Sequence, residues 1–122
     1  MSASPELLGI PLAPPVDRSA DTITAVLDLE EDWPVFAEHF PGNPVLPGSA
    51  TVHLMLGLAQ HLDPAARAMR HVRFARPLVP PARIRCTATT TRGVIVCTVL
   101  TVEDDREVVA VRGEAVSDVR AR

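Results

Sequence analysis

The chain contains no lysine and no tyrosine, and its 122 residues include only one tryptophan and three phenylalanines. So few aromatic side chains argue against a surface on which nucleic acid bases could stack. No apolar run is long enough to span a bilayer, and the N-terminus lacks the basic region and apolar block of a signal peptide. These absences predict a cytoplasmic protein that binds neither membranes nor nucleic acids.

The length is that of one ordinary domain, and 47% of the residues are apolar, which is enough to fill a core. We therefore expect a single domain over residues 1–122, in which residues 1–17 form an irregular, Pro-rich lead-in. Cys86 and Cys97 fall on adjacent predicted strands. In a small core with no other cysteine, we expect them to be buried free thiols.

Charge is distributed unevenly along the chain. Seven acids and one base lie between Asp17 and Glu38, whereas seven arginines and no acid lie between Pro64 and Val102. The arginines can be solvated positions that pair in part with the acidic half. They can also form a docking face for an acidic partner or a phosphate-bearing ligand.

A proline-rich loop and a helix follow the first predicted strand, "DTITAVLDLE", at residues 21–30. Four prolines between residues 34 and 47 exclude a long helix or a central strand there. The apolar run from Ser49 to Leu62 predicts a helix, with Ser49 as its N-cap and Asp63-Pro64 as its stop. Because this helix is apolar on nearly all sides, we expect it to be buried all round.

Four β-branched segments follow, at residues 71–79, 83–91, 94–102 and 107–116. Short turn sequences separate them, "RG" at residues 92–93 and "EDDR" at residues 103–106, and this spacing predicts an antiparallel meander. An antiparallel sheet has one apolar face to cover, which a single central helix can do. The pattern therefore predicts an α+β fold.

Two blocks of sequence resemble a known family. The segments "HFPGNPVLPG" and "VRFARPLVPPARIRC" are similar to the 3-hydroxyacyl-[acyl-carrier-protein] dehydratases of type II fatty acid synthesis and to related dehydratases of polyketide and aryl-polyene assembly. The resemblance implies a hotdog fold, a curved antiparallel sheet wrapped around one long helix. It also implies a dimer whose active sites lie at the interface, each with a histidine from one chain and a helix carboxylate from the other. The substrate is carried on phosphopantetheine of an acyl carrier protein, and neither a metal nor another cofactor is expected.

By this resemblance, His39 is the catalytic base that removes the C2 proton of the substrate. The carbonyl of Val45 accepts a hydrogen bond from the histidine ring, and the backbone N–H of Gly48 holds the thioester carbonyl at the helix start. The proline-rich corner keeps the ring oriented. We expect Val45 and Gly48 to contact substrate.

His53 is where the chain departs from the family, which has Glu or Asp at this helix position. The position four residues later, usually Gln or Asn, is Gly57, and no acid occurs between His39 and Leu62. His53 can serve as an altered catalytic acid, or it can be a structural histidine bonded to a carbonyl or water. Gly57 remains a candidate substrate contact.

Three functions are open at this point. The chain can be an active dehydratase that acts as a homodimer and uses His53. It can be one subunit of a heterodimeric dehydratase whose related partner supplies the carboxylate, or a non-catalytic module that binds acyl thioesters. The basic half suits any function that involves an acidic carrier protein, and the best candidates for docking it are four arginines, Arg67, Arg70, Arg73 and Arg76.

Overall fold

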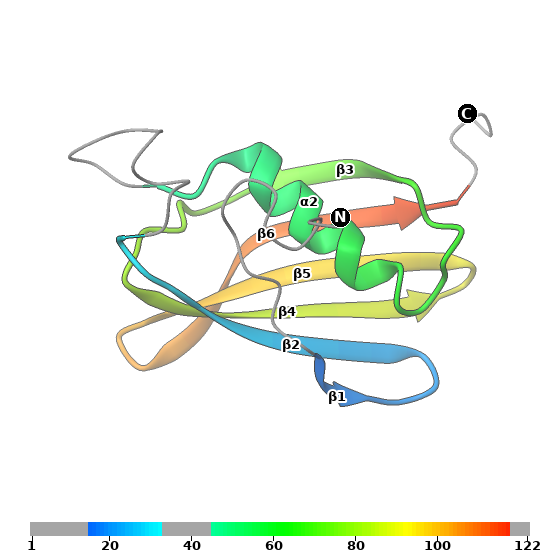
Figure 1. Ribbon diagram of the computed structural model, residues 1–122, viewed down its shortest axis with the longest axis horizontal. Helices are drawn as coiled ribbons and strands as arrows, with labels where there is room; N and C mark the ends of the chain where they lie inside the picture. The colour runs from blue at the N-terminus through cyan, green and yellow to red at the C-terminus, as the bar shows by residue number, and fades with distance from the viewer. Residues whose placement is uncertain (1–14, 33–44, 118–122) are drawn as a thin grey trace.

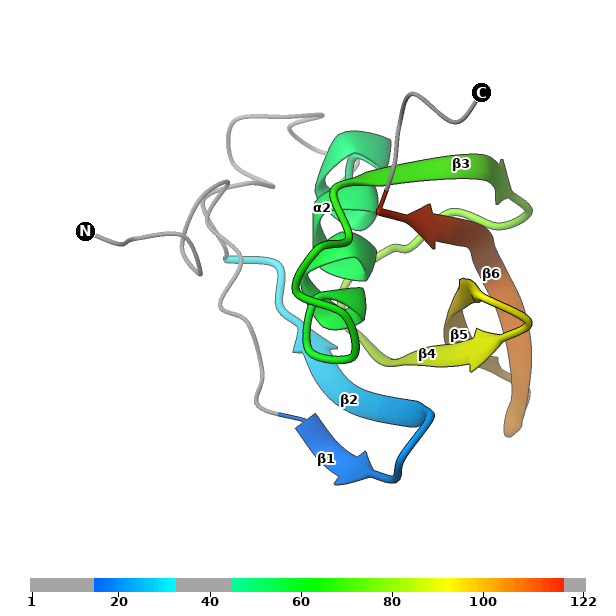
Figure 2. The same cartoon turned by 90° about the vertical axis from the view of Figure 1, so that its right-hand side faces the viewer.

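The computed structural model describes residues 15–32 and 45–117, which form one curved antiparallel sheet and one helix (Figure 1). The helix is α2, at Gly48–Ala59. The six strands are β1 (Pro15–Arg18), β2 (Thr22–Leu29), β3 (Ala68–Phe74), β4 (Ala82–Thr91), β5 (Val94–Glu103) and β6 (Arg106–Val116). Figure 2 shows the sheet curving around α2, so the predicted α+β arrangement is confirmed.

The predicted meander is formed by β4, β5 and β6, which are neighbours in the sheet order β1-β2-β4-β5-β6-β3. Two tight hairpins join them, with Thr91 paired to Val94 and Glu103 paired to Arg106. The two central residues of each turn have positive φ angles, 53° and 81° in the first turn and 53° and 63° in the second. Such angles define the hairpin turns whose twist matches that of the flanking strands.

Strand β3 does not lie next to β4, where a meander of consecutive strands would place it. It pairs with β6 at the far edge of the sheet, and it spans Ala68–Phe74 rather than residues 71–79. A bulge interrupts its ladder between Arg70 and Arg73, where His71 has a φ of 54°. After Phe74 the amides of Ala75 and Arg76 both donate to the carbonyl of Ala110. The chain then leaves the sheet, because Pro77, Pro80 and Pro81 have no N–H to donate to a neighbouring strand.

Alternation along the strands places the core between the sheet and α2. The buried strand residues on the helix side include Ile23, Ala25, Leu27 and Leu29 of β2, Ile84, Cys86 and Ala88 of β4, and Ile95, Cys97 and Val99 of β5. Both cysteines are buried free thiols on adjacent strands, as expected. Burial raises the pKa of each thiol to about 12.

Only one side of α2 is fully buried, so the expectation of a helix buried all round is wrong for this chain. The buried side faces the sheet and consists of Ala50, Thr51, Leu54, Met55, Leu58 and Ala59. Val52, His53, Leu56 and Gly57 are half-buried, and Ser49 and Gln60 are exposed. A single sheet covers one face of a helix, and the apolar residues of the second face need another cover.

The ends of α2 also differ from the prediction. Pro47, not Ser49, occupies the N-cap position, and no side chain caps the helix. The helix stops at Ala59, and the next residues continue in tighter turns until Oδ1 of Asp63 accepts a hydrogen bond from the Ala65 amide at 2.9 Å. The predicted stop at Asp63-Pro64 is therefore the end of the turn that follows the helix.

The lead-in is shorter than predicted. Pro15–Arg18 forms the edge strand β1, which pairs with β2 through a bulge. A proline is tolerated there because the first residue of an edge strand need not donate to the ladder. No helix in the described residues has the length and apolar character that crossing a membrane requires.

Candidate functional site

The two sequence blocks that carry the family resemblance meet at the start of α2. A pocket of about 330 Å³ opens there, and it is lined by the helix approach, the first turn of α2 and the segment after β3. The lining residues are Val45, Leu46, Gly48, Thr51, Phe74, Ala75, Arg76, Pro77, Leu78 and Val111. The pocket is therefore built from segments that are distant in sequence.

Two contacts hold these segments together. The amide of Leu46 donates a hydrogen bond to the carbonyl of Leu78 at 2.8 Å, and both side chains are buried. Gly48 lies against the ring of Phe74, because a Cβ built on this glycine would stand 3.1 Å from Phe74 Cζ. Any other residue at position 48 would press on the ring, so glycine permits this close approach.

The pocket receives the positive end of α2. The first N–H groups of a helix have no partner within the helix, and the macrodipole adds partial positive charge there. The first turn contains no acidic residue that would neutralise this charge. The hydroxyl of Thr51 donates its hydrogen bond to the carbonyl of Pro47 at 3.2 Å. This end of the helix can therefore hold an anionic or strongly polarised oxygen.

The predicted site residues that the structure describes do not all lie in this pocket. His39 lies outside the described residues. Val45 and Gly48 line the pocket. Their contact with substrate stays a prediction. His53 does not line it, because His53 lies further along α2 on the side turned away from the sheet.

His53 is half-buried rather than enclosed in the core. It shares its side of the helix with Ser49, four residues before it, and with Leu56 and Gln60, three and seven residues after it. The side-chain hydrogen bonds that α2 and its C-cap make within the described residues come from Thr51 and Gln60, not from His53. The described residues thus give His53 no structural partner of the kind expected for a core histidine.

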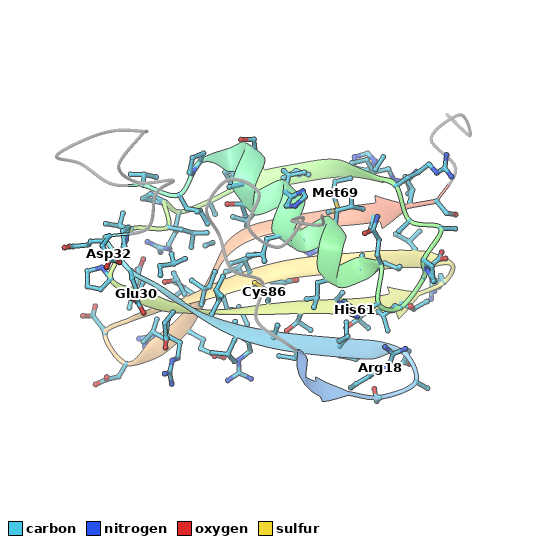
Figure 3. All side chains as sticks on the ribbon, in the orientation of Figure 1. Arg18, Glu30, Asp32, His61, Met69 and Cys86 are labelled. Carbon is cyan, nitrogen blue, oxygen red and sulfur yellow. The ribbon has the colours of Figure 1, made fainter. Side chains whose placement is uncertain are left out.

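A second, smaller pocket of about 30 Å³ lies beside the other half of α2. Figure 3 labels two of its lining residues, His61 after the helix and Cys86 on the sheet. The others are Ala25, Leu27, Leu54, Gly57 and Leu58. Beside this pocket, Nη1 of Arg18 donates a hydrogen bond to the carbonyl of His61 at 3.0 Å and so links β1 to the turn after α2. The raised pKa of Cys86 keeps its thiol protonated near neutral pH, so this thiol is a poor nucleophile.

The four arginines proposed for docking are all exposed, but their surroundings differ. Arg70 pairs with Glu114 at 3.0 Å and Arg76 with Glu103 at 3.2 Å. Arg76 also lines the main pocket. Arg73 lies opposite another arginine, Arg112, in the β3–β6 register.

Phe74 is one of several pocket residues that sequence reasoning missed. Its side chain is 54% exposed although it is large and apolar, and it touches the start of α2. Phe74 belongs to the segment "VRFARPLVPPARIRC", which the sequence analysis singled out. Its contact with Gly48, however, depends on how β3 is placed beside the helix. No local pattern contains that information.

Comparison with known proteins identifies the family. The sequence model of the ApeI-like family, described as ApeI dehydratase, matches residues 15–112. The chain belongs to this family. The suspected relation to the dehydratases is therefore confirmed. No curated protein sequence matches the chain significantly.

Solved structures confirm the hotdog fold. A chain of the dehydratase heterocomplex ApeI:P from Xenorhabdus doucetiae is 21% identical with a TM-score of 0.68, and the match covers 84% of this chain and 95% of that chain. The dehydratase domain of the polyketide protein PpsC from Mycobacterium tuberculosis is 16% identical with a TM-score of 0.72, with 88% of this chain matching 43% of that one. Zebra fish thioesterase superfamily member 2 is 14% identical with a TM-score of 0.65, and the match covers 93% and 85% of the two chains. At these identities the likeness concerns the fold alone.

Proposed function

We propose that this chain dehydrates a 3-hydroxyacyl thioester, carried on the phosphopantetheine of an acyl carrier protein, to a 2-enoyl thioester. The observation that supports this most directly is the pocket at the start of α2, where the two dehydratase-like sequence blocks meet. Membership of a dehydratase family supports the reaction class. The pocket volume of about 330 Å³ suits the thioester end of such a substrate.

In the proposed reaction a ring nitrogen of His39 takes the proton from C2 while the thioester carbonyl oxygen gains negative charge. The N–H groups at the start of α2, including that of Gly48, stabilise this oxygen. The C2–H electron pair then forms the C2–C3 double bond as the C3–O bond breaks. An acid must protonate the leaving hydroxide, which departs as water.

The carboxylate that the family has on this helix is missing from this chain, and this favours the second candidate, a heterodimeric dehydratase. No Asp or Glu occurs between His39 and Leu62. His53, at the position where the family has its carboxylate, faces away from the sheet and does not line the pocket of its own chain. Both observations are consistent with a site completed by a second subunit. The likeness to a dehydratase heterocomplex gives further support.

Carrier docking near the pocket completes the proposal. Among the arginines Arg67, Arg70, Arg73 and Arg76, the last lines the pocket. Its ion pair with Glu103 joins two half-exposed side chains, so it contributes little stability and can open for a phosphate. We expect Arg76→Glu to slow turnover of carrier-bound substrate more strongly than turnover of a small thioester analogue.

Mixing two chains, each expected to be inactive alone, tests whether one active site is shared between two subunits. The wild-type chain supplies His39 but no carboxylate, whereas a His39→Ala/His53→Glu variant supplies a carboxylate but no base. Each is assayed alone and mixed, with mass spectrometry of carrier-bound 3-hydroxyacyl substrate as the readout. We expect the mixture to dehydrate substrate about 10²-fold faster than either chain alone, the usual contribution of one acid or base.

The matched control is a His39→Ala/Gln60→Glu variant, which places the same charge on the same helix at an exposed position. It should not rescue the wild type. A wild-type chain that is fully active alone, and loses activity as His53→Ala, would instead support the homodimer with His53 as acid. A His39→Ala/His53→Glu variant that dehydrates substrate as fast alone as in the mixture would refute the role of His39 as the base.

A further inference from the structure

Thr51 is one of two polar residues that are buried in the described part of the chain, and only 1% of its surface is exposed. Its Oγ1 donates a hydrogen bond to the carbonyl of Pro47 at 3.2 Å, and its backbone amide donates to the same carbonyl at 3.1 Å. Pro47 is the residue that immediately precedes α2. Two donors of one buried residue therefore hold the carbonyl group at which the helix begins, and the exclusion of water strengthens the hydroxyl bond.

The carbonyl of Pro47 and the N–H of Gly48 belong to one planar trans peptide group, so they point in opposite directions. The carbonyl points into the helix, toward Thr51. The N–H of Gly48 must then point away from the body of the helix, and Gly48 lines the pocket there. Whatever holds the carbonyl of Pro47 therefore sets the direction of the N–H of Gly48.

Without a restraint, this peptide group would turn easily. The ring of Pro47 fixes its φ angle but leaves its ψ angle free, and Gly48 has no Cβ to limit its own φ angle. Within a helix, a threonine hydroxyl often bonds the carbonyl four residues earlier, where the neighbouring turns already hold the peptide. Here that carbonyl is the first of the helix, and no earlier helical turn holds its peptide group.

The way in which this end of the helix is held also leaves its N–H groups free. A usual N-cap side chain accepts a hydrogen bond from an N–H of the first turn and so occupies it. Pro47 has no such side chain, and no side chain in the described residues caps α2. Thr51 restrains the helix start from the carbonyl side instead. Fixed N–H donors stabilise a developing negative charge without a cost for reorientation.

We propose that Thr51 is a positioning residue, whose hydroxyl fixes the Pro47–Gly48 peptide group so that the N–H of Gly48 is aimed at the thioester oxygen of the substrate. This inference rests on the proposed function for the identity of that oxygen. The role requires no contact between Thr51 and the substrate, because the hydroxyl acts through the peptide group.

Two substitutions at position 51 test the role of the hydroxyl. Thr51→Val replaces it by a methyl group of similar size, whereas Thr51→Ser keeps it. The control is Thr101→Val, the same change at the other buried threonine, which lies on β5 and does not line the pocket. Labelling with ¹⁵N-glycine limits the amide signals to the six glycines, and Gly48→Ala identifies the signal of Gly48.

Nuclear magnetic resonance relaxation of the substrate-free chain gives the order parameter of the Gly48 N–H. We expect about 0.85 in the wild type, the value of a rigid backbone, and a fall toward about 0.6 in Thr51→Val. Thr51→Ser and Thr101→Val should keep the wild-type value. The order parameter of Gly57, which lies further along the same helix, should be unchanged in every variant and so shows that α2 is intact.

Turnover gives the second readout, in the mixture with the His39→Ala/His53→Glu variant and with the change made on the chain that supplies His39. Thr51→Val should lower kcat on the order of tenfold and leave KM unchanged, because the thioester oxygen gains its charge only in the transition state. Thr51→Ser should restore kcat to within about twofold of the wild type, since it keeps the same hydrogen bond.

The proposal is overturned if the Gly48 order parameter is the same in Thr51→Val as in the wild type, or if Thr101→Val lowers it equally. It is also overturned if the order parameter falls while kcat is unchanged, or if KM alone rises, since Thr51 would then act by binding substrate. Absence of turnover in every mixture would refute the proposed function instead. The order parameters need no substrate and would then decide by themselves whether Thr51 fixes the peptide group.

Discussion

The substitution Gly57→Ala tests whether any group packs against α2 at this position. A Cβ built on Gly57 meets no heavy atom of the described residues within 4 Å, although the position is half-buried. Glycine within a helix costs about 0.5–1 kcal/mol relative to alanine, because it loses more backbone freedom on folding. With no contact to lose, Gly57→Ala should raise the free energy of unfolding by about 0.5–1 kcal/mol. The melting temperature should rise by roughly 2–5 °C.

Two other glycines provide matched controls for the same substitution. At Gly48, the new Cβ would stand 3.1 Å from the Phe74 ring, which is 54% exposed and can move, so Gly48→Ala should change stability by under about 0.5 kcal/mol. At the buried Gly113, a Cβ would stand 3.0 Å from Cγ2 of Val72, whose Cα is also near at 3.5 Å. Gly113→Ala should therefore cost about 1–3 kcal/mol by overpacking.

Urea unfolding of the three variants at low micromolar protein concentration measures these differences. If Gly57→Ala lowered stability, the space beside Gly57 would be occupied, and our account of this face of α2 would be refuted. Turnover gives the second readout. If the acyl chain of the substrate contacts Gly57, the variant will be more stable yet slower with long-chain substrates. Unchanged turnover at every chain length would remove Gly57 from the substrate contacts.

Two further predictions concern ionisable groups. Because burial raises the pKa of the thiols of Cys86 and Cys97 to about 12, neither should react with a thiol reagent at pH 8 until the protein unfolds, and rapid labelling in the native state would contradict their burial. The unfolded thiols ionise near pH 9, so the unfolding free energy should fall as pH rises from about 9 to 12. Arg83 donates to Asp28 at 2.7 Å and lowers the pKa of that carboxyl, so its stabilising effect should be lost as pH falls through the lowered pKa. Both groups are exposed, and Asp28→Asn should therefore leave thermal stability nearly unchanged.

Local patterns predicted most of the secondary structure. Period-two alternation and the turn residues at 92–93 and 104–105 place β4, β5 and β6, because a strand and its hairpin neighbour are specified by adjacent residues. The apolar run after the prolines locates α2 to within a few residues. The N-cap was wrong because Pro47 already ends the extended approach, which lets the helix start at Gly48.

Long-range placement was not predictable in the same way. The position of β3 beside β6, its bulge at His71 and the contact between Phe74 and Gly48 depend on pairing across the whole sheet. The sheet covers only one face of α2, which explains why uniform apolarity along the helix misled the burial prediction. An apolar residue indicates that something covers it, but not whether the cover belongs to the same chain.

The sequence by itself determined the family resemblance, the identity of the proposed base and the absence of a helix carboxylate, since all three are properties of residue types at fixed spacing. Tertiary structure alone decided that Val45 and Gly48 share a pocket, that His53 does not line it, and that a basic strand forms an edge of the sheet. The physical reason is that chemical identity is local, whereas the direction of a side chain follows from packing between segments that are distant in the chain.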